Sequence, residues 1–472
     1  MIRNASKNVI GISEKNPHYF QYKGKEVLLL TAAEHYGAVI CKTFDYIKYF
    51  DALHAYGLNY TRIYPGAFVE CAGKWMDADS MAPGPDLITP WARSDVPGYH
   101  GGGNKFDLSK WDAEYFARLD DFLIQAEKRD IIVEICFFNC QYPDFVEYSP
   151  LHKDANIQGI GTGDHVAHQT LDDKELVAEQ LKYIEKIIQE TNKFDNVIYE
   201  FVDEPTLYLT PSNKVTEWVN VLIDKAIETE DKLPKKHLLA QQQELGVNFA
   251  EDDRIGLIVT QYIQCSARQV GGMDGLHNLY AFNKPIEMNE TAYINSWFKE
   301  DSTDVVGITR LEAWEFMLAG GAAVNQLNGY FNPANPGGES PVNAQVLQGL
   351  KNLRTFMEGF DYVNMYRIRP IRDVTIGARV SAIAELGKQY AIYMHHSFPG
   401  YKTWGMSYDP CYGVYEPVIT IGLDKGSYAV TFVEPATLKV IAETTVESDG
   451  GDVKIACPKY NLDIAIKIVL QE

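Results

Sequence analysis

Two stretches of the chain end in glutamates whose positions could support acid–base chemistry. Residues 197–205 read Val-Ile-Tyr-Glu-Phe-Val-Asp-Glu-Pro, which predicts a short buried strand ending in Asp203 and Glu204. Residues 284–292 read Lys-Pro-Ile-Glu-Met-Asn-Glu-Thr-Ala, and there Glu290 stands at the end of a second strand-like run. Two carboxylates that face one cleft are the minimal equipment for breaking a glycosidic bond.

The elements that must position these glutamates alternate between strand-like and helical patterns. Apolar runs without alternation predict strands buried on both faces, near 27–31, 58–64, 131–138, 196–202, 237–242, 255–261, 284–289 and 322–327. Helical spacing predicts helices at 43–56, after a capping box at Ser109–Asp112, through 176–188, at 214–230 and at 310–320. Eight strands alternating with helices predict an α/β fold of the (β/α)8 TIM barrel type. An open doubly wound sheet is the alternative, but no glycine fingerprint follows a strand.

The texture of the sequence changes near residue 366. Short β-type runs separated by turn signals replace helical periodicity there and predict an antiparallel β-sandwich. We therefore expect a catalytic barrel over 1–365, with a short N-terminal β-hairpin around 22–25 capping its bottom, and a sandwich domain over 366–472. The sandwich could brace the barrel or bind polymer. The lack of an obvious row of exposed aromatics favours bracing.

Composition narrows the classes of partner and ligand. The 472 residues carry a formal net charge of −21, which disfavours nucleic acid, anionic membranes and polyanionic substrates. Seven scattered cysteines predict no disulfide framework. No apolar run is long enough to cross a membrane.

The first residues lack the apolar stretch of a signal peptide, so we expect a cytoplasmic protein or one whose leader has been removed. His165 and His168 have no further ligand at zinc spacing, and we expect neither metal nor cofactor. The oligomeric state is not predicted.

The two carboxylate motifs together resemble those of clan A glycoside hydrolases. That clan places its acid/base after strand four in Asn-Glu-Pro and its nucleophile after strand seven in Lys-Pro-(apolar)-x-x-x-Glu. Residues 201–205 match the first motif with one change, and residues 284–290 match the second. Residues 106–120, 310–322 and 426–435 further resemble cellulase-like and apiosidase-like bacterial glycosidases with a C-terminal β-sandwich.

The resemblance implies a retaining hydrolase that cleaves β-glycosidic bonds of plant or microbial oligo- or polysaccharides by double displacement. Glu204 would be the acid/base and Glu290 the nucleophile. Asp203 stands where the clan has an asparagine, and an ionised aspartate can only accept hydrogen bonds. Either Asp203 shares the acid role or the contact with the sugar 2-hydroxyl differs. A non-catalytic carbohydrate-binding protein on a decayed hydrolase barrel, a transglycosylase and an inverting mechanism that uses Asp203 remain open.

Other strand ends supply candidate substrate-binding residues. The resemblance places Arg62 beside the nucleophile, where it would keep the carboxylate ionised; a structural ion pair is the alternative. The remaining candidates, in chain order, are Glu34, His35, Tyr64, Asn139, Tyr262, Trp297, Asn325, Asn328 and Tyr330. Capping of the following loop is the alternative for Glu34, and core packing is the alternative for Trp297 and the residues near the eighth strand. Trp75 and Trp91, in a long loop predicted over 65–106, are candidate stacking platforms.

Overall fold

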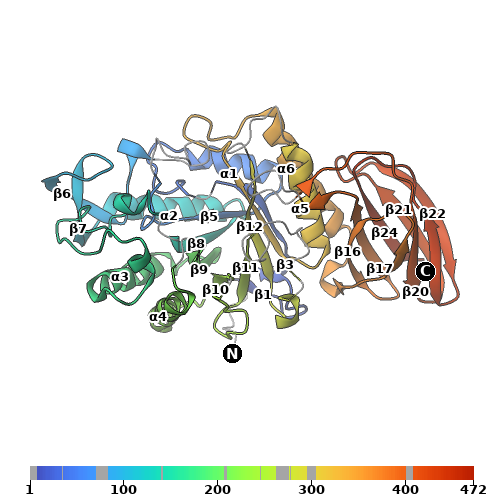
Figure 1. The fold of residues 1–472 in the computed structure, drawn as a ribbon, viewed down its shortest axis with the longest axis horizontal. Coiled ribbons are helices and arrows are strands. Elements are labelled where there is room, and N and C mark those ends of the chain that lie inside the picture. Colours follow the sequence, from blue (N-terminus) through green and yellow to red (C-terminus); the bar gives the residue numbers. More distant parts are fainter. Residues whose placement is uncertain are drawn as a thin grey trace.

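An eight-stranded parallel barrel forms the larger part of the computed structural model (Figure 1). The structure describes residues 8–34, 36–70, 83–139, 142–206, 210–244, 246–261, 276, 278–294, 304–399 and 408–471. The strands are β4 (Leu29–Ala33), β5 (Tyr60–Ile63), β8 (Ile132–Asn139), β9 (Val197–Asp203), β10 (Leu238–Gln242), β11 (Leu257–Thr260), β12 (Ile286–Ile294) and β13 (Ala323–Asn328). They pair in the order β4-β13-β12-β11-β10-β9-β8-β5. All eight predicted strands are therefore confirmed.

One asparagine joins the two strands at the ends of that order. The backbone N–H of Asn59, just before β5, donates to the carbonyl of Leu30 in β4 at 3.3 Å. Its side chain accepts from the Leu30 N–H at 3.2 Å and donates to the Leu28 carbonyl at 2.9 Å. These bonds bring β5 back beside β4, so the sheet is a barrel rather than an open doubly wound sheet.

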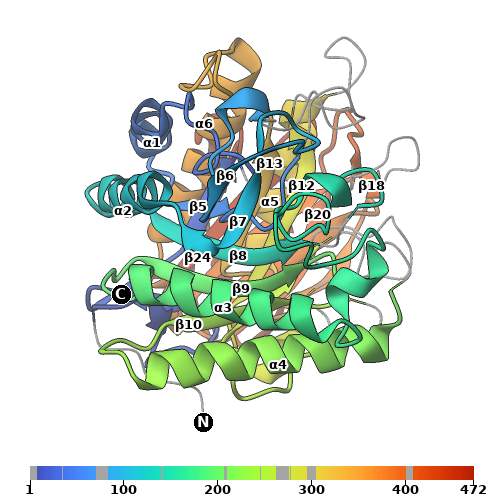
Figure 2. The same ribbon diagram turned by 90° about the vertical axis from the view of Figure 1, so that its left-hand side faces the viewer.

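In the part of the chain that the structure describes, six α-helices accompany the strands. They are α1 (Tyr46–Ala55), α2 (Ala113–Glu127), α3 (Lys174–Thr191), α4 (Ser212–Asp231), α5 (Val305–Leu318) and α6 (Pro341–Glu358). Figure 2 shows α3 and α4 side by side along the outside of the barrel. The predicted capping box is wrong, because Ser109 lies in a strand and donates to Asp107 at 2.6 Å. Asp112 is itself the N-cap of α2 and accepts from two backbone N–H groups. The helix α6 was not predicted.

The segment predicted as a long loop contains a hairpin. Its strands are β6 (Trp91–Pro97) and β7 (Asn104–Trp111), which pair antiparallel. Trp91 is only 1% exposed, and its ring stacks on that of Tyr183 in α3. Trp91 is therefore a core residue and not a stacking platform, which corrects the prediction. Trp75 lies outside the described residues.

The N-terminal residues form a small sheet at the bottom of the barrel. It has three strands, β1 (Gly11–Ile12), β2 (Phe20–Tyr22) and β3 (Lys25–Val27). The N–H of Ile10 donates to the carbonyl of Asp195 at 2.9 Å. Since Asp195 precedes β9, the contact is at the end of the barrel opposite the predicted catalytic residues.

The C-terminal sheets form the predicted sandwich. One has the order β14-β16-β17-β24-β21-β22 and the other β15-β20-β23. Their bounds are β14 (Tyr366–Arg367), β15 (Ile371–Val374), β16 (Arg379–Glu385), β17 (Gln389–His395), β20 (Val418–Leu423), β21 (Gly426–Val433), β22 (Val440–Ser448), β23 (Gly451–Ala456) and β24 (Asp463–Leu470). The strands β18 (Phe398–Pro399) and β19 (Tyr408–Asp409), which lie between β17 and β20 in the sequence, pair antiparallel as a separate two-stranded sheet. The domain boundary at 365/366 stays a prediction.

Helix α5 lies between the barrel and the sandwich. It contacts β12 and β13 on one side and β16 and β17 on the other, which explains why nearly all its side chains are buried. Arg310 pairs with Asp463 at 2.9 Å, and Arg379 pairs with Glu315 at 2.7 Å. These buried and half-buried ion pairs attach the sandwich to the barrel. None of the described helices is long and apolar enough to cross a membrane.

Candidate active site

A fully buried arginine organises the carboxylates at the end of the barrel. Arg62 projects from β5 and is 0% exposed. Its Nη1 donates to Glu290 Oε1 at 2.7 Å, and its Nε donates to Glu200 Oε2 at 2.7 Å. Its Nη2 lies 3.0 Å from Asp203 Oδ1. One guanidinium thus compensates carboxylates from β9 and β12, as a planar cation with five donors can.

Glu290 receives hydrogen bonds on both of its carboxylate oxygens. Besides Arg62 on Oε1, Gln261 Nε2 donates to Oε2 at 2.9 Å. The Tyr64 hydroxyl lies 3.3 Å from Oε1, but its proton goes to the nearer carboxylate of Asp203. Donors that converge on both oxygens favour the charged form of a carboxyl group. The surroundings therefore suit an ionised carboxylate, the form that a nucleophile requires.

Glu204 lies in an environment that favours the opposite protonation state. It is 2% exposed, and the Tyr142 hydroxyl donates to its Oε2. Burial, followed by the charges of Asp203 and Glu290, raises the pKa of Glu204 well above its ordinary value. A carboxyl held neutral in this way can donate a proton. The surroundings of Glu204 thus favour its neutral form and those of Glu290 its ionised form, which are the forms that an acid and a nucleophile need.

Both glutamates also have a left-handed backbone conformation. The φ angle is +47° at Glu204 and +48° at Glu290, a region that costs a residue with a side chain roughly 1–2 kcal/mol. The strand β12 pairs with β13 through Asn289 and then Thr291, so Glu290 is the extra residue of a bulge. A bulge redirects a side chain, and strained backbone gathers at functional sites.

The Asp203 carboxylate bonds to side chains at the ends of β5 and β8. Its Oδ2 accepts from the Tyr64 hydroxyl at 2.6 Å and from Asn139 Nδ2 at 3.2 Å, while Oδ1 lies by Arg62. Burial is the largest cause that raises the pKa of Asp203 well above its usual range, and Arg62 opposes it. Arg62, Tyr64, Asn139 and Asp203, predicted from three strand ends, therefore form one network.

Glu134, Glu200 and Glu287 lie nearer the starts of their strands than the carboxylates described above. Burial raises the pKa of Glu287 to about 8 and of Glu200 to about 7, and that of Glu134 well above its ordinary value. The Tyr60 hydroxyl lies 2.8 Å from Glu134 Oε2 and 2.7 Å from Glu287 Oε2. Because one hydroxyl proton cannot serve two acceptors, at least one of these carboxyls carries a proton. A charged residue inside an apolar strand was the sequence signal for Glu134 and Glu200.

Two predicted residues bond to the scaffold instead of the carboxylate cluster. The Glu34 carboxylate accepts from the backbone N–H groups of Tyr36, Gly37 and Ala38 at 2.7, 2.9 and 3.0 Å, so it caps the loop after β4. Asn328 donates to Asn343 Oδ1 at 2.8 Å and to a β4 carbonyl at 3.3 Å. These contacts agree with the alternative of loop capping for Glu34 and of packing for Asn328, and the prediction that either residue binds sugar stays a prediction.

The remaining predicted residues are either outside the described part of the chain or buried in it. His35, Tyr262 and Trp297 lie outside the described residues. Asn325 and Tyr330 are both buried at the end of the barrel wall. His168 is buried and bonds to the carbonyl of Thr162. The described part of the chain contains no group of three or more His, Cys, Asp or Glu placed to hold a metal ion.

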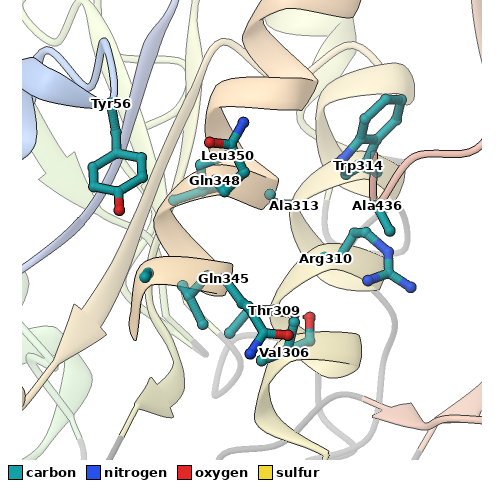
Figure 3. Close-up of a pocket in the computed structure, with 13 residues that line it drawn as sticks. Tyr56, Val306, Thr309, Arg310, Ala313, Trp314, Gln345, Gln348, Leu350 and Ala436 are labelled. Carbon is teal, nitrogen blue, oxygen red and sulfur yellow. Dashed lines mark hydrogen bonds between the residues drawn. The ribbon is translucent and has the colours of Figure 1, made fainter. Parts of the chain in front are cut away.

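A hollow on the outside of the barrel is separate from this network. It has a volume of about 370 Å³ and lies between α5, α6 and Ala436 of the sandwich (Figure 3). Arg310 and Trp314 line it, and none of the clustered carboxylates does. Trp314 packs against Phe356 and Tyr393, so this hollow belongs to the packing between the two domains.

Comparison with known proteins bears on the fold. No protein-family model matches the chain, and no curated protein matches it. Among solved structures, a glycoside hydrolase superposes with a TM-score of 0.64 at 11% identity, covering 98% of this chain and 97% of its own. A glycoside hydrolase family 5 protein from Bacteroides vulgatus ATCC 8482 gives a TM-score of 0.65 at 12% identity, covering 98% and 94%. The chain shares the fold of glycoside hydrolases. The agreement spans the barrel and the sandwich together, which confirms the predicted fold class.

Proposed function

We propose that this protein is a retaining glycoside hydrolase that cleaves β-glycosidic bonds of plant or microbial glycans. Glu290 is the nucleophile and Glu204 the acid/base. The observation that carries the proposal is the contrast between the two carboxyls. Arg62 and Gln261 donate to the two carboxylate oxygens of Glu290, whereas burial and neighbouring charge raise the pKa of Glu204 well above its ordinary value. The fold shared with glycoside hydrolases supports it.

The chemistry follows from that contrast. In the first step a carboxylate oxygen of Glu290 bonds to the anomeric carbon, the glycosidic C–O bond breaks, and Glu204 gives its proton to the leaving oxygen. In the second step a water molecule attacks the same carbon, its proton passes to Glu204, and the ester bond to Glu290 breaks. Arg62 and Gln261 lose an anionic partner in the first step and regain it in the second.

The proposal is tested by assaying release of reducing sugar from a panel of β-linked glycans and aryl β-glycosides. Glu290→Gln should abolish turnover. Glu204→Gln should lower it by roughly 10²- to 10⁴-fold, with a smaller loss on aryl glycosides whose leaving group needs no proton. Glu230→Gln is the matched control, because Glu230 is equally buried but bonds to His237, outside the proposed site. The three variants should show similar far-ultraviolet circular dichroism.

The stereochemistry of the product decides the mechanism. Proton NMR of the first product should show a β-anomer, as expected for double displacement. An α-anomer would indicate inversion with another carboxyl, such as Asp203, as partner. Saturable glycan binding without product would favour the binding protein, and full activity of Glu290→Gln would refute the proposed role of Glu290.

A further inference from the structure

A chain of two glutamine side chains joins the two proposed catalytic residues. The backbone N–H of Glu204 donates to Gln242 Oε1 at 3.1 Å. Gln242 Nε2 donates to Gln261 Oε1 at 2.9 Å, and Gln261 Nε2 donates to Glu290 Oε2 at 2.9 Å. Gln242 ends β10 and Gln261 follows β11, so the chain bridges the strands between β9 and β12. Both glutamines are buried, at 0% and 3% exposure.

The direction of this chain is fixed at one end by the backbone. A backbone N–H can only donate, so Gln242 must present its oxygen to Glu204 and its NH₂ group to Gln261. Glu244 Oε1, 3.5 Å from Gln242 Nε2, is a further acceptor on the same side. Gln261 must then turn its own NH₂ group to Glu290. Neither amide can reverse without placing two acceptors or two donors against each other.

We infer that Gln242 and Gln261 are positioning residues that hold the Glu290 carboxylate ionised and couple it to the backbone of Glu204. Gln242 fixes the orientation of the Gln261 amide, because its NH₂ group requires the Gln261 oxygen as acceptor. Gln261 therefore presents its own NH₂ group, and not its oxygen, to Glu290. The coupling runs in both directions, because the chain also anchors the amide of Glu204 in its left-handed conformation. The catalytic meaning of this inference rests on the proposed function, but the hydrogen-bond chain itself does not.

A role in filling space is the competing explanation, and titration separates the two. We would label the glutamates with ¹³C at the carboxyl carbon, follow the Glu290 resonance with pH by NMR, and assign it from its loss in Glu290→Gln. This measurement uses the intact protein and needs no substrate. Failure of the proposed hydrolase activity would therefore leave this test unaffected.

Gln261→Met removes the donor and keeps the length of the side chain. Because a hydrogen bond to a charged group is lost, the Glu290 carboxyl should titrate about one to two pH units higher than in the wild type. Gln261→Glu also lacks the donor when ionised and should move the titration in the same direction, so the test survives if one variant fails to fold. If activity is present, the acidic limb of kcat/KM should move with the titration.

The double variant tests whether the two glutamines act as one chain. Gln242→Met should raise the titration by a smaller amount, and it should add nothing in the Gln261→Met background. Gln243→Met is the matched control, because Gln243 is a buried neighbour whose side chain donates to the Gln241 carbonyl and accepts from the Phe249 N–H rather than joining the chain. An unchanged titration in Gln261→Met, or additive effects of the two variants, would overturn the inference. A change in melting temperature alone would also overturn it.

Discussion

Replacing Arg62 with methionine tests the electrostatic basis of the site. The guanidinium pairs with Glu200, Asp203 and Glu290 at 2.5, 3.0 and 2.7 Å, and all four side chains are at most 1% exposed. Methionine keeps much of the volume but neither the charge nor the donors. Breaking a buried ion pair from one side costs about 3–5 kcal/mol, since the remaining charge is uncompensated. We expect Arg62→Met to lose about that much unfolding free energy at pH 8.

The loss should depend on pH in a defined direction. Arg62 opposes the upward shift in the pKa of Glu200 and Asp203, so its removal raises the pKa of both carboxyls further. The variant then binds more protons than the wild type when folded, and its deficit grows as pH rises. Each carboxyl affected contributes up to about 1.4 kcal/mol per pH unit. Between pH 5 and pH 8 the deficit should therefore increase.

Urea denaturation followed by tryptophan fluorescence at pH 5, 6, 7 and 8 measures this. Arg254→Met is the control, because Arg254 also pairs with two carboxylates, Asp224 and Asp252, but its side chain is 29% exposed. A pair at the surface should cost about 0–1 kcal/mol. The reasoning is refuted if Arg62→Met loses no more stability at pH 8 than Arg254→Met. A deficit that is constant from pH 5 to pH 8 refutes it equally.

Three further predictions follow from neighbouring contacts. Burial raises the pKa of Glu287 from 4.5 to about 8, so the free energy of unfolding falls as pH rises from about 5 to 8. Glu287→Gln should be more stable than the wild type by about 1–3 kcal/mol at pH 8 and equally stable near pH 4, as measured by urea titration. The amide should keep the bond to Tyr60. Tyr142→Phe removes a donor that lowers the pKa of Glu204, so the basic limb of the kcat/KM profile should move to higher pH. Asn59→Ala removes two side-chain bonds at the barrel seam and should cost about 1–3 kcal/mol in thermal or urea unfolding.

Much of the fold could be predicted because its signals are local. Apolar runs and helical spacing are properties of short segments, and they located all eight barrel strands. The errors came where a local signal had a tertiary competitor. Ser109 matches a cap by sequence but bonds to Asp107 within a hairpin. Trp91 follows a glycine- and proline-rich segment but packs against α3. The helix α6 was missed.

Local patterns were enough to place Glu204 and Glu290 on barrel strands, since each follows an apolar run in a recognisable motif. Glu204 directly follows β9, but β12 continues past Glu290 to Ile294, beyond the strand end that the sequence predicts. The groups that surround the two glutamates could not be predicted in this way. Arg62 and Glu290 are 228 residues apart in the chain, and their contact depends on barrel closure and on the bulge at Glu290. The direction of the glutamine chain likewise depends on side chains from adjacent strands. Protonation and hydrogen-bond direction are set by distances across the barrel, and no periodicity along the sequence encodes those distances.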